Sequence, residues 1–239
     1  MDPLAINIGK VERYFKSKER NIEVRVRPPY VVRLDGVGFS KAMGEFSQPR
    51  DIKVHKAIVD AAIFLLNRYS FNMGYVFSDE INLFTLDETN PFGGRVQKIV
   101  SVFSGFASAI CSVSLGKAVA FDARVITLDR ENDAEKYVIY RARISFNNLI
   151  NKLIHIYGLH IEGEMKLRDR VKVLSSTVNI EELPVWMRWG SSLYWRLNLV
   201  EGVDPRTGKK MITLRRKIEV SEGYKMLLEV INSPGYVIS

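Results

Sequence analysis

Two short acidic segments beside apolar, strand-like runs are the residues with the clearest chemical potential. Asp35 closes one such run, and Asp79 with Glu80 separates two others. Asp79 follows Asp35 by 44 positions, which is enough for a strand–helix–strand connection of roughly 30 residues or more. If these strands are neighbours, Asp35 and Asp79 lie side by side at one sheet edge. Two converging carboxylates are what a two-Mg²⁺ phosphoryl-transfer site needs.

The residues around these acids support the same interpretation. Gly36 directly follows Asp35, and without a side chain its backbone carbonyl or amide can approach a metal or phosphate closely. Gly38 has similar freedom, and Glu80 is either a further ligand or an acid that supports the ligands. Taken singly, Asp35-Gly36 also suits a strand-end turn, and Asp79-Glu80 suits a solvated hairpin tip. Their occurrence together favours the metal site.

A second candidate site lies at the start of a predicted helix. Arg95 and Lys98 are one helical turn apart there, where free backbone amides and the helix dipole favour phosphate. A solvated first turn explains the pair equally well. The three histidines have no metal-ligand spacing, and Gly36-Val37-Gly38 lacks the third glycine of a dinucleotide fingerprint. Core packing is the favoured role of the three tryptophans, with base stacking as the alternative; they are Trp186, Trp189 and Trp195.

The elements that must position these residues follow the order β-α-β-β-α-β, which is the ferredoxin-like arrangement. Apolar residues at i, i+3, i+4 and i+7 predict the two helices. Both helices are expected to cover one face of the sheet and to leave the other face for substrate. The expected elements are a strand over 30–35, a helix over 49–72 stopped by Gly74, strands over 75–78 and 81–86, a helix over 95–111 and a strand over 118–128.

The rest of the chain predicts a long helix and a basic hairpin. The helix covers about 134–157 and carries Asn147 and Asn151 on a stripe that needs partners if it is buried. Strands over 192–200 and 210–214 surround a turn at 204–208. We therefore predict an α+β fold, with a catalytic unit over 1–130 and an RNA-binding extension over 131–239 packed on it as one compact body. The basic side chains of the hairpin are Arg206, Lys209, Lys210, Arg215, Arg216 and Lys217.

Composition limits the class of protein. The 239 residues are 46% hydrophobic and 26% charged, as in a soluble globular protein. The net charge of +8 favours anionic partners such as nucleic acid, although solubility alone also explains it. Cys111 is the single cysteine, which predicts a reducing compartment. No apolar run is expected to reach the roughly 20 residues of a membrane span, and the start of the chain lacks a signal-peptide pattern, so the cytoplasm is predicted.

At these motifs the chain resembles the tRNA-His guanylyltransferase family, and especially its guanylyltransferase-like branch. The resemblance covers nearly the whole chain. The matching segments are Val32–Phe39 (VRLDGVGF), Ser78–Leu83 (SDEINL), Phe92–Ser101 (FGGRVQKIVS), Phe121–Val125 (FDARV), Asn147–Leu149 (NNL) and, near the C-terminus, Thr207-Gly208 and Leu214–Arg216.

The resemblance implies a polymerase-type palm with two Mg²⁺ ions, nucleotide addition at an RNA 5′ end in the 3′-to-5′ direction, and assembly as a homotetramer or dimer of dimers. Asp35, the Gly36 carbonyl and Asp79 match the metal ligands of the family, and Glu80 matches the adjacent acid. The positions implied in nucleotide binding are Arg33, Gly36, Val37, Gly38, Phe39, Ser78, Arg95 and Lys98. Those expected to bind RNA are Asn147, Asn148, Lys209, Lys210, Arg215 and Arg216.

Three departures from the family pattern bear on specificity. The His-Ile-Asn-Asn motif of the family reads Ser145-Phe146-Asn147-Asn148 here, so the histidine is lost. In true guanylyltransferases this motif is linked to reading tRNA-His, and its loss favours the guanylyltransferase-like branch. Val37 stands where arginine is frequent, and Gly94-Arg95 replaces a pair of arginines.

The predicted function is template-dependent 3′-to-5′ addition of nucleotides to 5′-truncated tRNA, after activation of the 5′ end by ATP or GTP. Two Mg²⁺ ions are the expected cofactors, and tRNA and nucleoside triphosphates are the expected partners, without a membrane. The alternatives are a guanylyltransferase specific for tRNA-His, an enzyme that condenses free nucleotides, and a non-catalytic RNA-binding domain.

Overall fold

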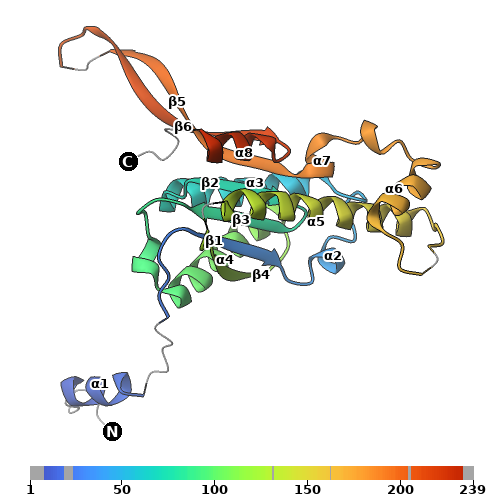
Figure 1. Cartoon of the computed structure of the whole chain (residues 1–239). Helices are drawn as coiled ribbons and strands as arrows, with labels where there is room; N and C mark the ends of the chain where they lie inside the picture. Colours follow the sequence, from blue (N-terminus) through green and yellow to red (C-terminus); the bar gives the residue numbers. More distant parts are fainter. Residues whose placement is uncertain (1–7, 19–23, 131, 162, 204–205, 234–239) are drawn as a thin grey trace.

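A computed structural model describes residues 8–18, 24–130, 132–161, 163–203 and 206–233. Within these ranges the chain forms an α+β fold around one six-stranded antiparallel sheet (Figure 1). The strand order is β4-β1-β3-β2-β5-β6. The first seven major elements are α1 (Ile8–Lys16), β1 (Tyr30–Gly36), α3 (Ile52–Tyr69), β2 (Met73–Phe77), β3 (Glu80–Thr85), α4 (Val96–Leu115) and β4 (Phe121–Thr127).

The predicted β-α-β-β-α-β order is confirmed for β1 to β4. One assumption about it is wrong, because β1 and β2 are not neighbours: β3 lies between them and pairs with both. This split arrangement follows from the tight β2–β3 hairpin, which returns the chain beside β1. The turn before β3 therefore meets the end of β1, and the two acidic segments converge through β3 instead of through β2.

Helix α3 begins and ends for identifiable local reasons. The Asp51 carboxylate accepts hydrogen bonds from the backbone N–H groups of Lys53 and Val54, which caps the first turn. Ser70 adopts a left-handed conformation with φ of 55° and ends the helix. The prediction that Gly74 stops this helix is wrong. Gly74 is a buried residue inside β2, where the side chains of Leu83, Leu193 and Leu66 would touch an added Cβ at 3.4–3.5 Å.

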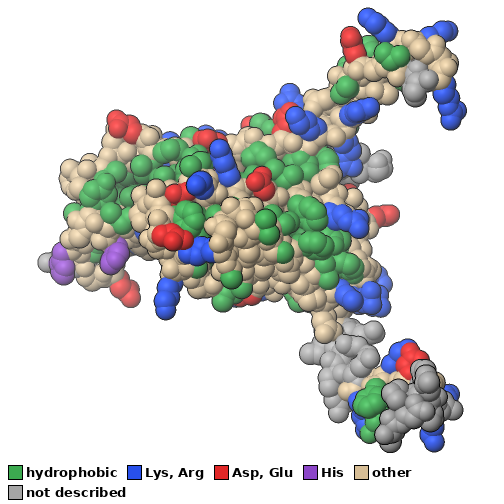
Figure 2. Space-filling view, turned by 180° about the vertical axis from the view of Figure 1, so that it is seen from behind, with side chains coloured by type: hydrophobic (Ala, Val, Ile, Leu, Met, Phe, Trp, Pro, Cys, Tyr) green, Lys and Arg blue, Asp and Glu red, His purple; other side chains and the backbone are tan. Residues whose placement is uncertain are grey.

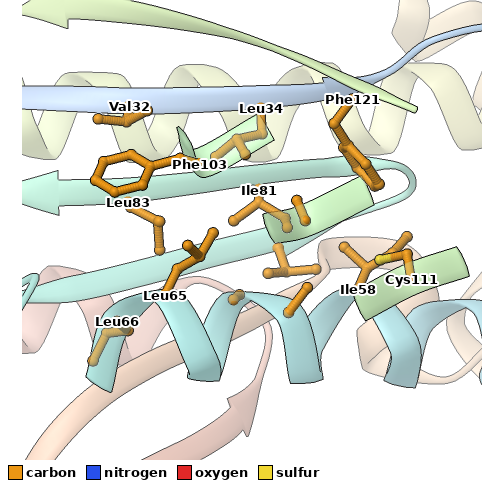
Figure 3. Close-up of a cluster of buried hydrophobic side chains, with 14 of the residues drawn as sticks. Val32, Leu34, Ile58, Leu65, Leu66, Ile81, Leu83, Phe103, Cys111 and Phe121 are labelled. Atoms are coloured by element: carbon orange, nitrogen blue, oxygen red, sulfur yellow. The ribbon is translucent and has the colours of Figure 1, made fainter. Parts of the chain in front are cut away.

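Helices α3 and α4 cover one face of the sheet and enclose the larger core (Figure 3). Its side chains come from alternate positions of the strands and from the inner faces of both helices. Val32 and Leu34 of β1 and Ile81 and Leu83 of β3 are all fully buried there. The residues added by α4 are Ile99, Phe103, Ala107 and Cys111, the last of which is buried as a free thiol.

Helix α4 contradicts one expectation from composition. Its 20 residues, Val96–Leu115, are long and apolar enough to cross a membrane by length and composition alone. In the fold, α4 packs its four buried residues against α3 and the sheet, and 22% of its apolar window is buried.

The opposite face of the sheet is also covered, contrary to the prediction that it is left for substrate. Helices α5 (Asp133–Ile156) and α8 (Lys225–Asn232) pack there on Tyr75, Phe77 and Phe84. The amphipathic α5 has its own apolar stripe and must bury it, and the second sheet face is the available surface. Residues on both sides of position 130 therefore share one sheet.

The remaining elements extend this body at two ends. A third cluster packs the end of α5 against α6 (Leu167–Ser175). Strands β5 (Ser191–Val203) and β6 (Lys210–Glu222) join the sheet beside β2 and then project beyond it as a long hairpin (Figure 1). The short helices are α2 (Phe39–Ala42), η2 (Pro91–Gly94), η3 (Ile180–Glu182) and α7 (Val185–Trp189).

Candidate active site

The paired acids meet at the end of β1. The register places Asp35 opposite Glu80 of β3 on one side and opposite Asp122 of β4 on the other. The backbone N–H of Gly36 donates to the carbonyl oxygen of Asp79 at 3.0 Å, which fixes the β2–β3 turn beside β1. Asp35 and Asp79 therefore share one end of the sheet.

The loop after Asp35 is held in a shape that requires glycine. A Cβ on Gly36 would lie 2.6 Å from Cδ2 of Phe39, whose ring is buried against Phe121. Gly38 has a φ of 61° and precedes α2. Val37 is exposed and anchored through its N–H to the carbonyl of Ala120 at 2.8 Å. Of the four N–H groups in the segment 36–39, those of Gly36 and Val37 are therefore used within the fold, which leaves those of Gly38 and Phe39.

The electrostatics of these residues suit a bound cation. Burial raises the pKa of the Asp35 carboxyl, and the negative charge of Asp79 raises it further, whereas the nearby Arg33 guanidinium lowers it. A divalent cation between the acids would offset this repulsion. Two carboxylates and the Gly36 carbonyl form a hard oxygen donor set that fits Mg²⁺, which takes its other ligands from water and substrate phosphates. No cluster of three or more His, Cys, Asp or Glu side chains stands ready for a metal in the described part of the chain.

Glu80 lies opposite Asp35 in the ladder, but its carboxylate is engaged by other side chains. Glu80 is buried and forms an ion pair with Arg141 of α5, which donates from Nε to Oε1 at 2.9 Å and from Nη2 to Oε2. Asn82 donates to the same Oε1 at 2.8 Å and itself accepts from the Tyr137 hydroxyl. The carboxylate of Glu80 therefore joins the sheet to α5 in the interior.

A pocket opens to solvent beside Asp79. Of the predicted nucleotide-binding residues, Phe39 and Ser78 line it. Sequence reasoning missed most of its wall, because most of these residues lie in the stretch 40–55, which carries no recognised motif, and Lys152 lies far along the chain. Trp186, for which base stacking was the alternative to core packing, also lines the pocket. The missed residues are Ser40, Met43, Phe46, Ser47, Gln48, Pro49, Arg50, Asp51, Val54, His55 and Lys152.

Two aromatic rings close one side of this pocket. His55 is buried, hydrogen-bonds the Ser191 hydroxyl at 2.9 Å and stacks on Trp186 with ring centroids 4.8 Å apart. Burial and the positive charge of Arg50 lower the pKa of His55 to about 4. Trp195, by contrast, packs against the main core and donates to the carbonyl of Phe71 at 2.8 Å, as expected for a core tryptophan.

The basic pair at the start of α4 lies at the other end of the sheet. The backbone of Arg95 pairs with that of Arg25 in an isolated β-bridge. The nearby Asn90 side chain accepts a hydrogen bond from the Tyr30 hydroxyl at the beginning of β1, whereas Asp35 lies near the end of that strand. Lys98 is exposed on the first turn of α4. Within one copy of the chain, the structure does not bring Arg95 and Lys98 to the acids. Arg33 lies on β1 beside them, and its Nε is buried without a hydrogen-bond partner.

The predicted RNA contacts fall in two places. On α5, Asn147 accepts from Arg170 at 2.8 Å and Asn148 is exposed. On the hairpin, Lys209, Lys210, Arg215 and Arg216 are all exposed, and Figure 2 shows Lys and Arg side chains gathered along it. Part of the predicted turn, residues 204 and 205, lies outside the described residues.

Together, the antiparallel β-α-β-β-α-β sheet, the paired carboxylates at its end and the adjoining pocket define a palm-like nucleotidyl-transfer architecture. The sequence profile of the tRNAHis guanylyltransferase family matches residues 12–146. The chain belongs to this family, whose members are nucleotidyltransferases that add nucleotides at the 5′ end of tRNA.

Solved structures share this fold, and one curated relative shares part of the sequence. The fold resembles a bacterial tRNA(His) guanylyltransferase-like protein in complex with ATP, with a TM-score of 0.72, 20% identity and coverage of 98% of this chain and 100% of that one. The same kind of bacterial protein in complex with GTP gives a TM-score of 0.68, 21% identity and coverage of 96% and 93%. The tRNA(His) guanylyltransferase of Saccharomyces cerevisiae gives a TM-score of 0.65 and 17% identity, with coverage of 84% of this chain and 95% of that one. An uncharacterized protein, R259, of Acanthamoeba polyphaga mimivirus is 25% identical over 73% of each chain.

Proposed function

We propose that this protein repairs 5′-truncated tRNA by adding the missing nucleotides in the 3′-to-5′ direction, directed by the opposite strand of the acceptor stem. The observation that carries the proposal is the meeting of Asp35 and Asp79 beside a pocket that also holds Arg50 and Lys152. ATP or GTP would activate a monophosphorylated 5′ end, in keeping with the nucleotides bound by the similar bacterial proteins.

Different residues of the chain would bind the metal ions and orient the nucleotide in this reaction. Asp35, Asp79 and the Gly36 carbonyl would hold two Mg²⁺ ions, which when bound neutralise phosphate charge and favour ionisation of the attacking hydroxyl. The backbone amides of Gly38 and Phe39 and the Ser78 hydroxyl would orient the nucleotide. Positioning and charge neutralisation then suffice, and no histidine base is required.

The repair reaction is favoured over addition restricted to tRNA-His by the residue at position 145. Ser145 is fully buried and occupied by hydrogen bonds from Arg50. The side chain that replaces the family histidine is therefore unavailable to an RNA substrate in this structure.

A primer-extension assay tests the proposal. Purified protein is mixed with Mg²⁺, nucleoside triphosphates and tRNAs of several identities that lack the first 5′ nucleotide, with Asp79→Asn as the control. We expect addition of the nucleotide complementary to the acceptor strand in each tRNA, and its loss in the control. Addition of guanosine to tRNA-His alone, whatever the opposite base, would establish the His-specific alternative. Condensation of free nucleotides without RNA, or metal-independent RNA binding without addition, would establish one of the other two alternatives.

We place the reaction in the cytoplasm. The proposal rests on the one cysteine, Cys111, which lies as a free thiol in the main core. Burial and the charge of Asp60 raise the pKa of this thiol to about 12, which keeps it protonated and unreactive.

A further inference from the structure

Arg50 is a cation without a carboxylate partner at the wall of the pocket. Its Nη1 donates to the Ser145 hydroxyl at 3.2 Å and to the carbonyl of Met187, and its Nη2 donates to the carbonyl of Ser145 at 3.0 Å. All three acceptors are neutral. Among the described residues, no acid lies within ion-pair distance of this guanidinium.

These three bonds determine which donors remain. A guanidinium has five N–H groups, and the anchoring bonds occupy both N–H groups of Nη1 and one of Nη2. The Nε–H and the second Nη2–H are left, and they form the parallel fork that binds carboxylate or phosphate in bidentate fashion. The small side chain of Ser145 provides the space in which Arg50 is anchored.

Lys152 brings a second unpaired cation to the same pocket. It lies on α5, is partly buried, and forms no ion pair or hydrogen bond within the described chain. Burial lowers its pKa, and the positive charge of Arg50 lowers it further, while Asp79 acts in the opposite direction. Burial likewise lowers the pKa of Arg50, to about 10. Two cations that destabilise each other in a partly desolvated wall gain stability from an anion between them.

The carboxylates of the pocket do not supply that anion. Asp51 is committed to capping α3 and accepts from the backbone N–H groups of Ser47, Lys53 and Val54. Asp79 is the other acid in the wall, and it belongs to the proposed metal site. An anion that also ligates the metal at Asp79 would be a phosphate group.

We propose that Arg50 and Lys152 form a phosphate-binding pair that holds a substrate phosphate beside Asp79. This inference rests on the proposed function, and it assigns to that site a phosphate contact made by residues of α5 and of the segment before α3. The phosphate belongs either to the nucleoside triphosphate or to the 5′ end of the RNA. The chemistry of recognition is the same for both sources.

Equilibrium binding to the full chain tests the pair. The probes are inorganic tripolyphosphate, ATP, adenosine, and one truncated tRNA carrying a 5′-hydroxyl, 5′-monophosphate or 5′-triphosphate. Lys152→Gln is the main variant because Lys152 holds no other group in place. Arg50→Lys keeps the charge but removes the fork. Lys56→Gln, an exposed lysine of α3 outside the pocket, is the matched control.

We expect Lys152→Gln and Arg50→Lys each to weaken binding of a phosphorylated probe by about tenfold or more, with adenosine, 5′-hydroxyl tRNA and the Lys56→Gln control unaffected. If affinity is lost only for tripolyphosphate and ATP, the bound phosphate belongs to the nucleotide. If affinity is lost only for phosphorylated tRNA, the bound phosphate belongs to the RNA 5′ end. Unchanged affinity of Lys152→Gln for every phosphorylated probe overturns the proposal. If the wild-type protein failed the extension assay but bound phosphate through Lys152, the function would be wrong and the phosphate site would stand.

Discussion

At the scale of single residues, the adjacent acids Asp79 and Glu80 have different environments. Asp79 lines an open pocket and lies close enough to Asp35 to raise the pKa of that carboxyl. Glu80 is enclosed by Arg141, Asn82 and the sheet. Asp79 lies in the turn between β2 and β3, whereas Glu80 is the first residue of β3 and is bound by Arg141 of α5, and this difference separates the two acids.

The environment of Glu80 predicts a role in stability. Glu80→Gln removes the charge that compensates the buried Arg141, so we expect the free energy of unfolding to fall by about 3 kcal/mol, measured by urea denaturation. Asp79→Asn should leave the unfolding free energy nearly unchanged and abolish nucleotide addition. If Glu80→Gln were as stable as the wild type but inactive, Glu80 would have a direct part in the chemistry.

At the scale of elements, the β5–β6 hairpin has two different faces. Directly paired residues of an antiparallel ladder lie on the same face. One face carries Arg215 opposite Asn198 and Lys217 opposite Arg196. Arg216 lies on the other face, where its guanidinium stacks over the ring of Trp195 at 4.4 Å. Arg215 and Arg216 were predicted together as RNA contacts, but the structure directs them to opposite sides.

This geometry separates the expected effects of the two arginines on RNA binding. The double variant Arg215→Gln/Lys217→Gln should weaken tRNA binding and reduce the slope of log affinity against log salt by up to about 0.9 for each lost phosphate contact. Arg216→Gln should leave that slope unchanged, because its charge is engaged with Trp195. Fluorescence anisotropy across a KCl series measures both quantities. An equal loss of slope in the Arg216→Gln variant would show that both faces contact RNA.

The elements differ in how far their sequence determines them. The period of apolar residues predicts α3, α4 and α5, and the strand runs predict β1 to β4, because each pattern reflects local geometry. The end of α3 was misplaced because Ser70 adopts the left-handed conformation that glycine usually supplies. Arg50 and Lys152 escaped prediction because 102 positions separate them along the chain and only packing of α5 on the sheet brings both to one pocket. Asp35, Gly36 and Asp79 could be predicted from the sequence because they border the strands that position them.

At the scale of the whole molecule, the projecting hairpin exposes an apolar surface. Leu199 and Leu214 are paired and are 74% and 59% exposed, and Ile212 on the same face is 66% exposed. Exposed apolar rows of this kind mark interaction sites. The face also carries Glu201 on one side of the leucine pair and Arg216 on the other, so two copies stacked in opposite directions would bring opposite charges together.

We therefore expect the chain to self-associate, as the predicted tetramer requires, with this hairpin face as one of its contacts. Leu199→Lys places a charge in the row and should lower the molar mass in solution, measured by multi-angle light scattering. Val200→Lys, on the opposite face of the same strand, is the matched control and should leave the assembly intact. A wild-type protein that is monomeric at micromolar concentrations would contradict the expectation.

The buried His55 predicts how the stability of the whole fold depends on pH. Its pKa is about 4 in the folded protein, against 6.5 for an unperturbed histidine, so the unfolded chain takes up the proton first as the pH falls. The stabilisation is present in full above about pH 6.5 and is lost progressively toward pH 4, by roughly 3 kcal/mol in all. His55→Gln keeps a hydrogen-bonding group near Ser191 and should flatten this dependence in urea unfolding measured from pH 7 to pH 4, whereas the exposed His155→Gln should not. Identical slopes for the His55→Gln variant and the wild type would show that the carboxylates alone control acid unfolding.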